Sequence, residues 1–207
     1  MIGTTRPSGA LTVKKINPAG PGLAWKIRNF PHYFRGAWRV LLALLVARIT
    51  QLPVMYGQLA IRIVKASGEI IDYGVVSYRV VATAGVTFIA ADIAGGANDS
   101  SLFKYHGVGT GTTAEASGDT ALVTESTTAL NPDSTRATGS QSSSTNTYTT
   151  VGTNTFDASA AITEHGIFSQ AATGGGTLLD RSVFSAINVV SGDSLQTTYV
   201  LTLSAGG

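Results

Sequence analysis

The sequence contains no cysteine, and only 13% of its 207 residues are charged. Without cysteine the chain can form no disulfide framework, no thiolate zinc site and no cysteine nucleophile. The charged fraction is about half of the value near 25% that is usual for soluble domains. Glycine, threonine, serine and alanine take its place, a composition typical of β-rich proteins. Such a surface is common in proteins that pack against neighbouring subunits.

Acidic residues are absent from the first third of the chain. Residues 1–68 hold ten Lys and Arg and no Asp or Glu, whereas residues 69–207 hold four basic and twelve acidic residues. This asymmetry indicates a basic arm that meets an acidic surface, whether of a nucleic acid, a membrane or a protein.

Motifs for nucleotide binding are also absent. The glycine-rich stretch 107–113 follows a strand candidate, but it lacks the Lys and Ser or Thr of a P-loop. A dinucleotide fingerprint needs an apolar helix directly afterwards, and residues 113–119 are polar. The glycines therefore indicate a tight turn of the chain.

Side chains that could carry chemistry gather late in the chain, where Glu164 precedes His165 and Asp180 precedes Arg181. With His106 they could form a metal site or an acid–base set, yet no paired-histidine motif supports this. Glu164 and Arg181 fall on neighbouring candidate strands, so we predict a structural ion pair between them. We expect no catalytic residue, no metal site, no cofactor and no enzymatic activity.

Residues 1–57 are predicted to form a basic, aromatic N-terminal arm that contains a short helix. Prolines and glycines between residues 18 and 22 interrupt regular structure. Residues 40–47 are all apolar, too few for the roughly twenty that span a bilayer. Together with residues 36–39 they could form a basic amphipathic helix of three or four turns on a membrane surface. Their uniform apolarity favours burial between subunits instead.

Residues 24–39 interleave aromatic rings with basic side chains, the residue types that dominate binding interfaces. The segment could fold back on its own domain, contact nucleic acid, or anchor the chain on another protein. We favour the protein anchor. The residues predicted to bind this partner are Trp25, Arg28, Phe30, Phe34, Arg35, Trp38, Arg39, Leu42 and Leu45.

From residue 58 onward, apolar residues alternate with polar ones, which predicts strands. Turn signals recur at short intervals, so we expect residues 58–207 to form an antiparallel β-sandwich or a jelly-roll-like domain. The predicted strands are 59–64, 70–74, 75–81, 102–106, 146–156, 160–169, 177–188 and 194–204. Residues 86–94 fit a helix or a strand, and residues 119–125 predict one or two helical turns.

Several phrases of the chain resemble a family of small structural proteins of tailed bacteriophages. They are IDYGVVSYRVV (71–81), FKYHGVGTGTTAEASGDTALVTE (103–125), NPDSTRATG (131–139), TVGTNTFDASAAITEHGIFSQAATGG (150–175) and LLDRSVFSAINVVSGDSLQTTYVLTL (178–203). The resemblance covers residues 70–207, about two thirds of the chain. It implies a virion component, a capsid cement or decoration protein, and it carries no catalytic residue with it.

The resemblance implies that the partners are the major capsid protein and other copies of this chain. The chain would lie on the capsid surface after assembly in the host cytoplasm. We expect no small-molecule substrate, nucleic acid or membrane partner. The alternative is a phage tail or fibre-associated protein, an adhesin or adaptor. A glycan hydrolase is a third possibility, but it needs paired carboxylates, and the acids of this chain are scattered singly.

Overall fold

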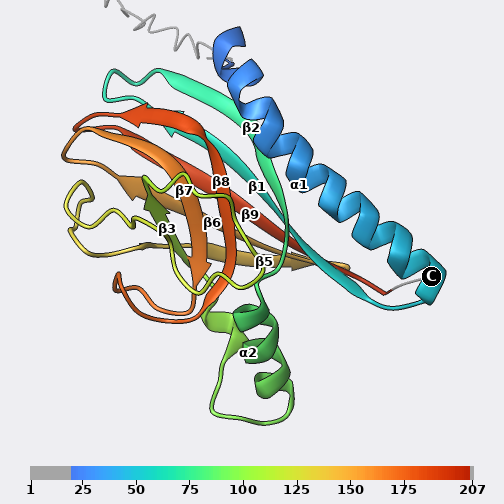
Figure 1. The fold of residues 1–207 in the computed structure, drawn as a ribbon. Coiled ribbons are helices and arrows are strands. Elements are labelled where there is room, and N and C mark those ends of the chain that lie inside the picture. The colour runs from blue at the N-terminus through green and yellow to red at the C-terminus, as the bar shows by residue number, and fades with distance from the viewer. Residues whose placement is uncertain (1–19, 206–207) are drawn as a thin grey trace, which may run out of the picture.

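The computed structural model describes residues 20–205, which form two antiparallel sheets packed face to face, with a long helix along one side (Figure 1). The first sheet has the strand order β2-β1-β9-β6-β5 and the second β4-β3-β7-β8. The elements are α1 (Leu23–Thr50), β1 (Val54–Val64), β2 (Ile70–Val80), α2 (Thr83–Ile93), a 3₁₀ turn (Ser100–Leu102), β3 (Tyr105–Gly109), β4 (Ala137–Thr138), β5 (Ser140–Ser144), β6 (Thr147–Thr155), β7 (Ala160–Phe168), β8 (Leu178–Val189) and β9 (Ser194–Ser204). The expected β-sandwich is therefore confirmed.

Strand β9 is the centre of the first sheet, where it pairs with β1 on one side and β6 on the other. Its side chains alternate as predicted: Leu195, Thr197, Tyr199 and Leu201 are buried, and the residues between them are partly exposed. This alternation supplies one wall of the core, and apolar residues of β1, β7 and β8 supply most of the rest. The alternation of apolar and polar residues in the sequence thus predicts which face of each strand is buried.

Two local predictions were wrong. Residues 70–80 form one continuous strand, because Gly74 adopts a positive φ of 63° beside a shift in the β1–β2 register and the pairing resumes after it. Residues 119–125 form no helix, because the amides of Val123 and Thr124 donate to the buried carboxylate of Glu164 instead. Residues 86–94, which fitted either state, fall on helix α2 except for the last.

Helix α1 is much longer than the short helix expected, with 28 residues. It runs through Pro31, which costs about 3 kcal/mol in a helix interior. Contacts of Trp25 and Asn29 with the sandwich hold the turn before the proline in place, and this packing outweighs the local cost. Strand β1 also begins earlier than expected, at Val54.

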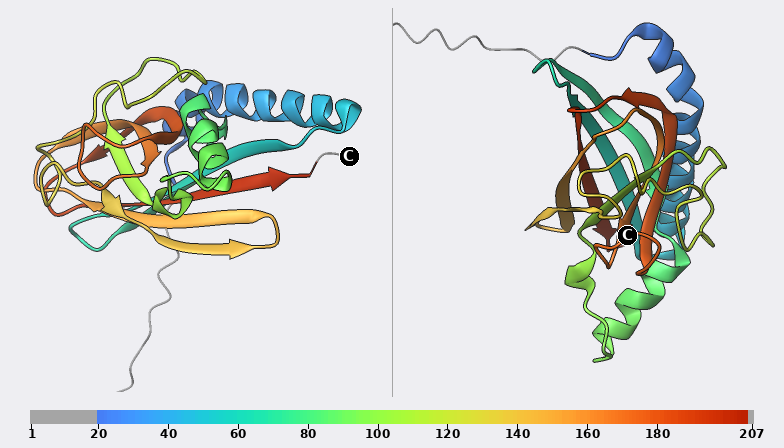
Figure 2. Two further views of the ribbon diagram at one scale, coloured as in Figure 1. Left: turned by 90° about the horizontal axis from the view of Figure 1, so that it is seen from below. Right: turned by 90° about the vertical axis from the view of Figure 1, so that its left-hand side faces the viewer.

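The helix lies unusually close to β2 at Gly36, which is one of its buried residues. A Cβ atom added at Gly36 would overlap the carbonyl oxygen of Tyr78. Figure 2 shows the consequence: α1 lies flat along the sandwich and its C-terminal end projects beside the ends of β1 and β9. A glycine is required there by the close approach of two backbones.

Gly36→Ala should therefore destabilise the protein, although alanine in place of glycine inside a helix normally stabilises it by about 1 kcal/mol. We expect the free energy of unfolding to fall by about 1–3 kcal/mol in urea denaturation. Gly118→Ala is the matched control, because nothing lies within 4 Å of the added atom. A Gly36→Ala protein as stable as the wild type would contradict the tight contact.

Candidate functional site

Helix α1 covers the opening between β2, the edge of one sheet, and β8, the edge of the other (Figure 1). The side chain of Asn29 joins all three elements. Its Nδ2 donates to the carbonyl oxygen of Val76 in β2 at 3.1 Å, and its Oδ1 accepts from the amide of Ser185 in β8 at 2.9 Å. One buried amide thus satisfies a free backbone group on each sheet edge, which also blocks those edges from pairing with another strand.

Trp25 makes a similar contact one turn earlier. Its Nε1 lies 3.1 Å from the carbonyl oxygens of both Ser185 and Ala186, and its ring packs edge-on against Tyr73 at 4.7 Å between centroids. Trp25 was predicted to bind a partner, and the structure places it on its own domain. This agrees with the fold-back alternative for this part of the arm.

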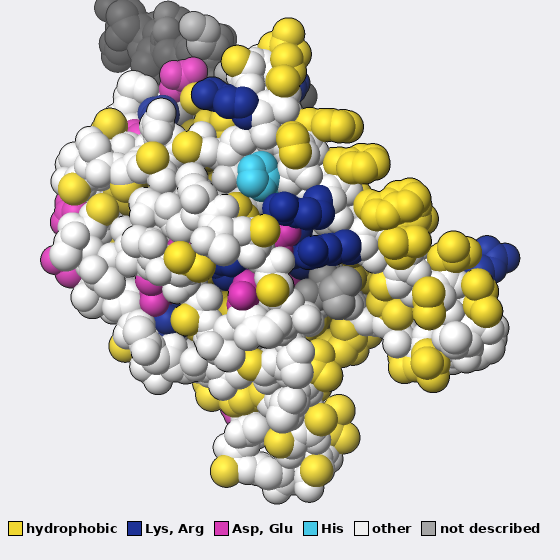
Figure 3. Space-filling model, viewed as in Figure 1, with side chains coloured by type: hydrophobic (Ala, Val, Ile, Leu, Met, Phe, Trp, Pro, Cys, Tyr) yellow, Lys and Arg dark blue, Asp and Glu magenta, His cyan; other side chains and the backbone are white. Residues whose placement is uncertain are grey.

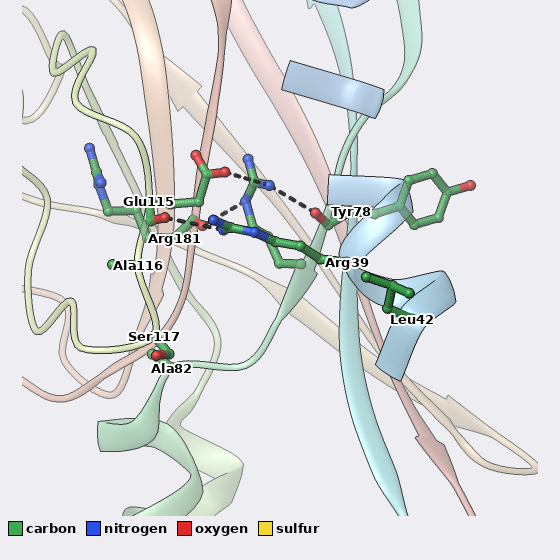
Figure 4. A pocket seen from close by; sticks show the side chains of 9 residues that line it. Arg39, Leu42, Tyr78, Ala82, Glu115, Ala116, Ser117 and Arg181 are labelled. Atoms are coloured by element: carbon green, nitrogen blue, oxygen red, sulfur yellow. Dashed lines mark hydrogen bonds and ion pairs between the residues drawn. The ribbon is translucent and has the colours of Figure 1, made fainter. Parts of the chain in front are cut away.

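A cluster of charges fixes the middle of α1 (Figure 4). The carboxylate of Glu115, which is 4% exposed, lies 2.8 Å from NH1 of Arg79 and 3.4 Å from Nε of Arg35. These contacts are ionic, because their geometry is not that of directed hydrogen bonds. Arg39 donates to the backbone carbonyl of Glu115 at 3.4 Å. Arg35 and Arg39, both predicted to bind a partner, are therefore turned toward their own domain.

The same cluster lines a pocket of about 480 Å³ between α1 and the loop that carries Glu115. Arg181 lies on its far wall and is held by Glu164, by Asp119 and by the carbonyl oxygen of Thr113. The cations that line the pocket thus have partners within the domain. We interpret the pocket as part of the polar surface on which α1 packs.

The outer face of α1 is apolar along its whole length, and we call it the α1 ridge. Its members are 42–74% exposed and comprise Leu23, Ile27, Phe30, Phe34, Trp38, Leu41, Leu42, Leu45 and Ile49, and Val46 is exposed on α1 beside them. Five of the predicted partner-binding residues belong to it, and Arg28 is exposed beside it. Figure 3 shows hydrophobic side chains standing in a row along this edge of the molecule. In the single chain, the apolar run 40–47 is buried only at Val40 and Ala47.

The ridge continues into a wider apolar side of the molecule. Within residues 20–205, 14 of the 16 exposed large hydrophobic residues lie on α1, on Leu52 just after it, on α2 or at the end of β9. Beside them is a hollow of about 360 Å³, lined mainly by Met55, Ile89, Phe103, Leu179, Leu201 and Leu203. Monomeric proteins seldom expose so much contiguous apolar surface.

Glu164 and Arg181 form the ion pair that their strand positions predicted. Oε2 of Glu164, which is fully buried, lies 2.8 Å from both Nε and NH2 of Arg181. The carboxylate also accepts hydrogen bonds from the backbone amides of Gly111, Val123 and Thr124. With all its acceptors engaged, Glu164 holds the loops after β3 onto β7, which is a structural role.

The two histidines of the sandwich lie in contact between the sheets. Nδ1 of His106 is 3.1 Å from Nε2 of His165 and 2.8 Å from the hydroxyl of Thr197. Burial lowers the pKa of His106 to about 3, and burial together with repulsion from His106 lowers the pKa of His165 well below 6.5. Both imidazoles are therefore neutral at pH 7. They are also sealed from solvent, with 0% and 2% exposure.

Asp180 is also enclosed, and its carboxylate accepts a hydrogen bond from the hydroxyl of Tyr199 at 3.3 Å. Burial raises the pKa of Asp180 to about 7, although the nearby Arg79 guanidinium favours the charged form. The acid–base set considered from the sequence is thus closed to any substrate. In the part of the chain that the structure describes, no three His, Asp or Glu residues are grouped as metal ligands.

Sequence analysis missed Asn29, Arg79 and Glu115, the residues that orient α1. Asn29 was hidden among aromatic and basic residues, and Glu115 lies in a loop without periodicity. Hydrophobic patterning carries no signal for such contacts, because their partners are 36 to 156 residues away along the chain. Within residues 20–205, neither α1 nor α2 meets the length and hydropathy of a bilayer-spanning helix.

Comparison with known proteins gives no match among protein families, curated proteins or solved structures. The resemblance to phage structural proteins therefore stays a prediction.

Glu115→Gln should destabilise the protein strongly, because it leaves the buried guanidinium of Arg79 without its counter-charge. Removing one partner of a buried pair costs about 3–5 kcal/mol, to be measured by urea denaturation. Glu69→Gln, at an exposed residue of the β1–β2 turn, is the control and should change stability by about 0.5 kcal/mol or less. Equal stability of the two variants would show that Glu115 does not hold α1.

Stability should also fall in mild acid. Between pH 6.5 and 3.8 the unfolded chain binds protons on both histidines, which stay neutral when folded, whereas the folded chain holds one extra proton on Asp180. From these three groups the unfolded state thus binds one proton more, so they should lower the free energy of unfolding by about 1.4 kcal/mol per pH unit. Burial also lowers the pKa of His32, which should add to the fall. Above pH 7 these three groups should contribute no slope.

The variant His165→Asn removes one of the two unfolded-state protons and should reduce the slope in this window by about 1.4 kcal/mol per pH unit. Urea denaturation of both proteins across the window measures the difference. The same slope in wild type and variant would mean that His165 is not neutral in the folded protein.

Proposed function

We propose that this chain is a structural virion protein, a capsid cement or decoration protein, whose apolar side on α1 binds the major capsid protein or a neighbouring subunit. The observation that carries the proposal is the α1 ridge. Large apolar side chains are exposed on one side of a domain that is otherwise polar at its surface. A surface of this kind is typical of proteins that function within an assembly.

The distribution of charge supports the proposal. All three arginines after residue 69 are buried in ion pairs, namely Arg79, Arg136 and Arg181. Lys26, Arg28 and Arg48 are exposed on α1, while Glu69, Asp72, Asp99, Asp133 and Asp157 are exposed on the body. The ridge thus has basic flanks, which suit an apolar surface with acidic surroundings.

We propose no enzymatic activity. The histidines and carboxylates of the sandwich are enclosed and hydrogen-bonded to one another or to the backbone. The charged groups beneath α1 likewise hold the helix on the domain. These groups stabilise the domain, which leaves binding as the role for its surface.

Copy number in purified particles tests the location. If heads and tails are separated and the chain is quantified by gel, we expect it in the head fraction, at a copy number comparable to that of the shell protein. Labelling with an antibody in electron micrographs should mark the whole head surface. A few copies confined to the tail fraction would support the tail-associated alternative and contradict the cement function.

Substitution on the ridge tests the surface. Trp38→Glu places a charge where the contact is expected to be dry, so occupancy on heads that lack the wild-type chain should fall at least about tenfold. Val190→Glu, at an exposed apolar residue outside α1 and α2, is the matched control and should bind like the wild type. Full occupancy by Trp38→Glu would exclude the ridge from the contact.

A further inference from the structure

We infer that the α1 ridge is a self-association surface on which two copies of this chain pair, α1 against α1, in antiparallel orientation. The first observation is that the ridge is straight. Apart from the adjacent Leu41 and Leu42, its residues follow one another at intervals of three or four positions along a helix of 28 residues. The mean spacing is close to 3.6, so the ridge stays on one face for about 42 Å instead of winding around the helix.

The chain's own fold leaves the ridge uncovered. The opposite face is fixed on the sandwich by Asn29, by the close contact at Gly36 and by the ion pairs of Glu115. Rotation of α1 to bury the ridge would break all three. No other part of residues 20–205 can therefore cover the ridge, and a second molecule can.

The exposed area is what a stable pair requires. Nine side chains that are 42–74% exposed present on the order of 1,000 Å² of apolar surface. A standard specific interface buries about 800 Å² on each partner, and permanent homodimers bury more and are more apolar. The largest apolar patch of an ordinary monomer is about 300–600 Å².

The spacing of the ridge points to a second copy. Positions 23, 27, 30 and 34 are separated by four, three and four residues, and so are positions 38, 42, 45 and 49. The pattern is thus the same in both directions about Gly36. A two-fold axis beside Gly36 places Ile27 of one copy opposite Leu45 of the other, and Phe34 opposite Trp38. Eight of the nine ridge residues then meet a ridge residue, as an isologous interface requires, and Leu41 lies opposite Pro31.

The cations along the ridge make salt a test that separates this pair from a contact with an anionic surface. Arg35 and Arg39, which flank its middle, are turned toward Glu115 of their own domain. Of the exposed cations, Lys26, Arg28 and Arg48 are close to its ends, and Arg39 is near its middle. Their mutual repulsion in a pair is screened by salt, so the pair should persist in about 1 M salt, whereas a contact with phosphate groups would weaken.

The mass of the full chain in solution is the first test. Light scattering after gel filtration should give a dimer for the wild type and for Val190→Glu, at low and at high salt. Phe34→Glu should raise the dissociation constant about 100-fold or more, and an unchanged thermal melt of its monomer would show that the fold is intact. A wild-type protein that is monomeric would overturn the inference. So would a wild-type protein that binds anionic phospholipid vesicles in a flotation assay when that binding depends on the ridge residues.

Cysteine cross-linking tests the orientation, because the chain has no cysteine of its own. Ile27→Cys and Leu45→Cys are about 27 Å apart along one helix, so they cannot join within a chain. Oxidation of their mixture should give a cross-linked dimer, and oxidation of either alone, or of Val190→Cys, should not. Cross-linking of each variant with itself would mean parallel pairing. Because these measurements use the isolated chain, their failure leaves the proposed binding to heads untouched, and the reverse also holds.

Discussion

The amide of Asn29 hydrogen-bonds to the edges of both sheets, and this contact determines which face of α1 lies on the sandwich. An amide buried without partners would cost a few kcal/mol, so the helix cannot turn about its axis without losing that contact. Gly36 and Glu115 hold the same orientation further along. The apolar ridge faces solvent because the polar and small residues of the helix are the ones that fit the groove.

Buried charged side chains in the sandwich are likewise paired with residues of the same domain. Glu164 and Glu125 each hold an arginine, and the Arg136 guanidinium also stacks on the ring of Phe168 at 3.5 Å. Buried charges are tolerated only when they are paired and hydrogen-bonded. By using its arginines internally, the domain leaves α1 as the main basic surface of residues 20–205. The charge asymmetry of the sequence thus becomes an asymmetry between two sides of the molecule.

Much of the fold could be predicted from the sequence, because strands with one buried face alternate with period two. The last four strands lie within one or two residues of their predicted bounds, and Glu164 and Arg181 are paired as expected. Helix α1 was underestimated because Pro31 breaks a helix when only local preferences count. The prediction that Trp25 and Arg35 bind a partner rests on their residue types, and sequence gives no indication that both side chains contact their own domain.

The sequence by itself determined the β-sandwich, the structural ion pair and the position of the apolar and basic residues in the first third of the chain. Only the tertiary structure decided that these apolar residues form an exposed ridge. Periodicity shows that a helix has two unlike faces, but the assignment of one face to the core depends on distant partners such as Val76, Tyr78 and Ser185. Here polar contacts with those partners place the apolar face of α1 outward. A surface helix usually packs its apolar face on the core instead.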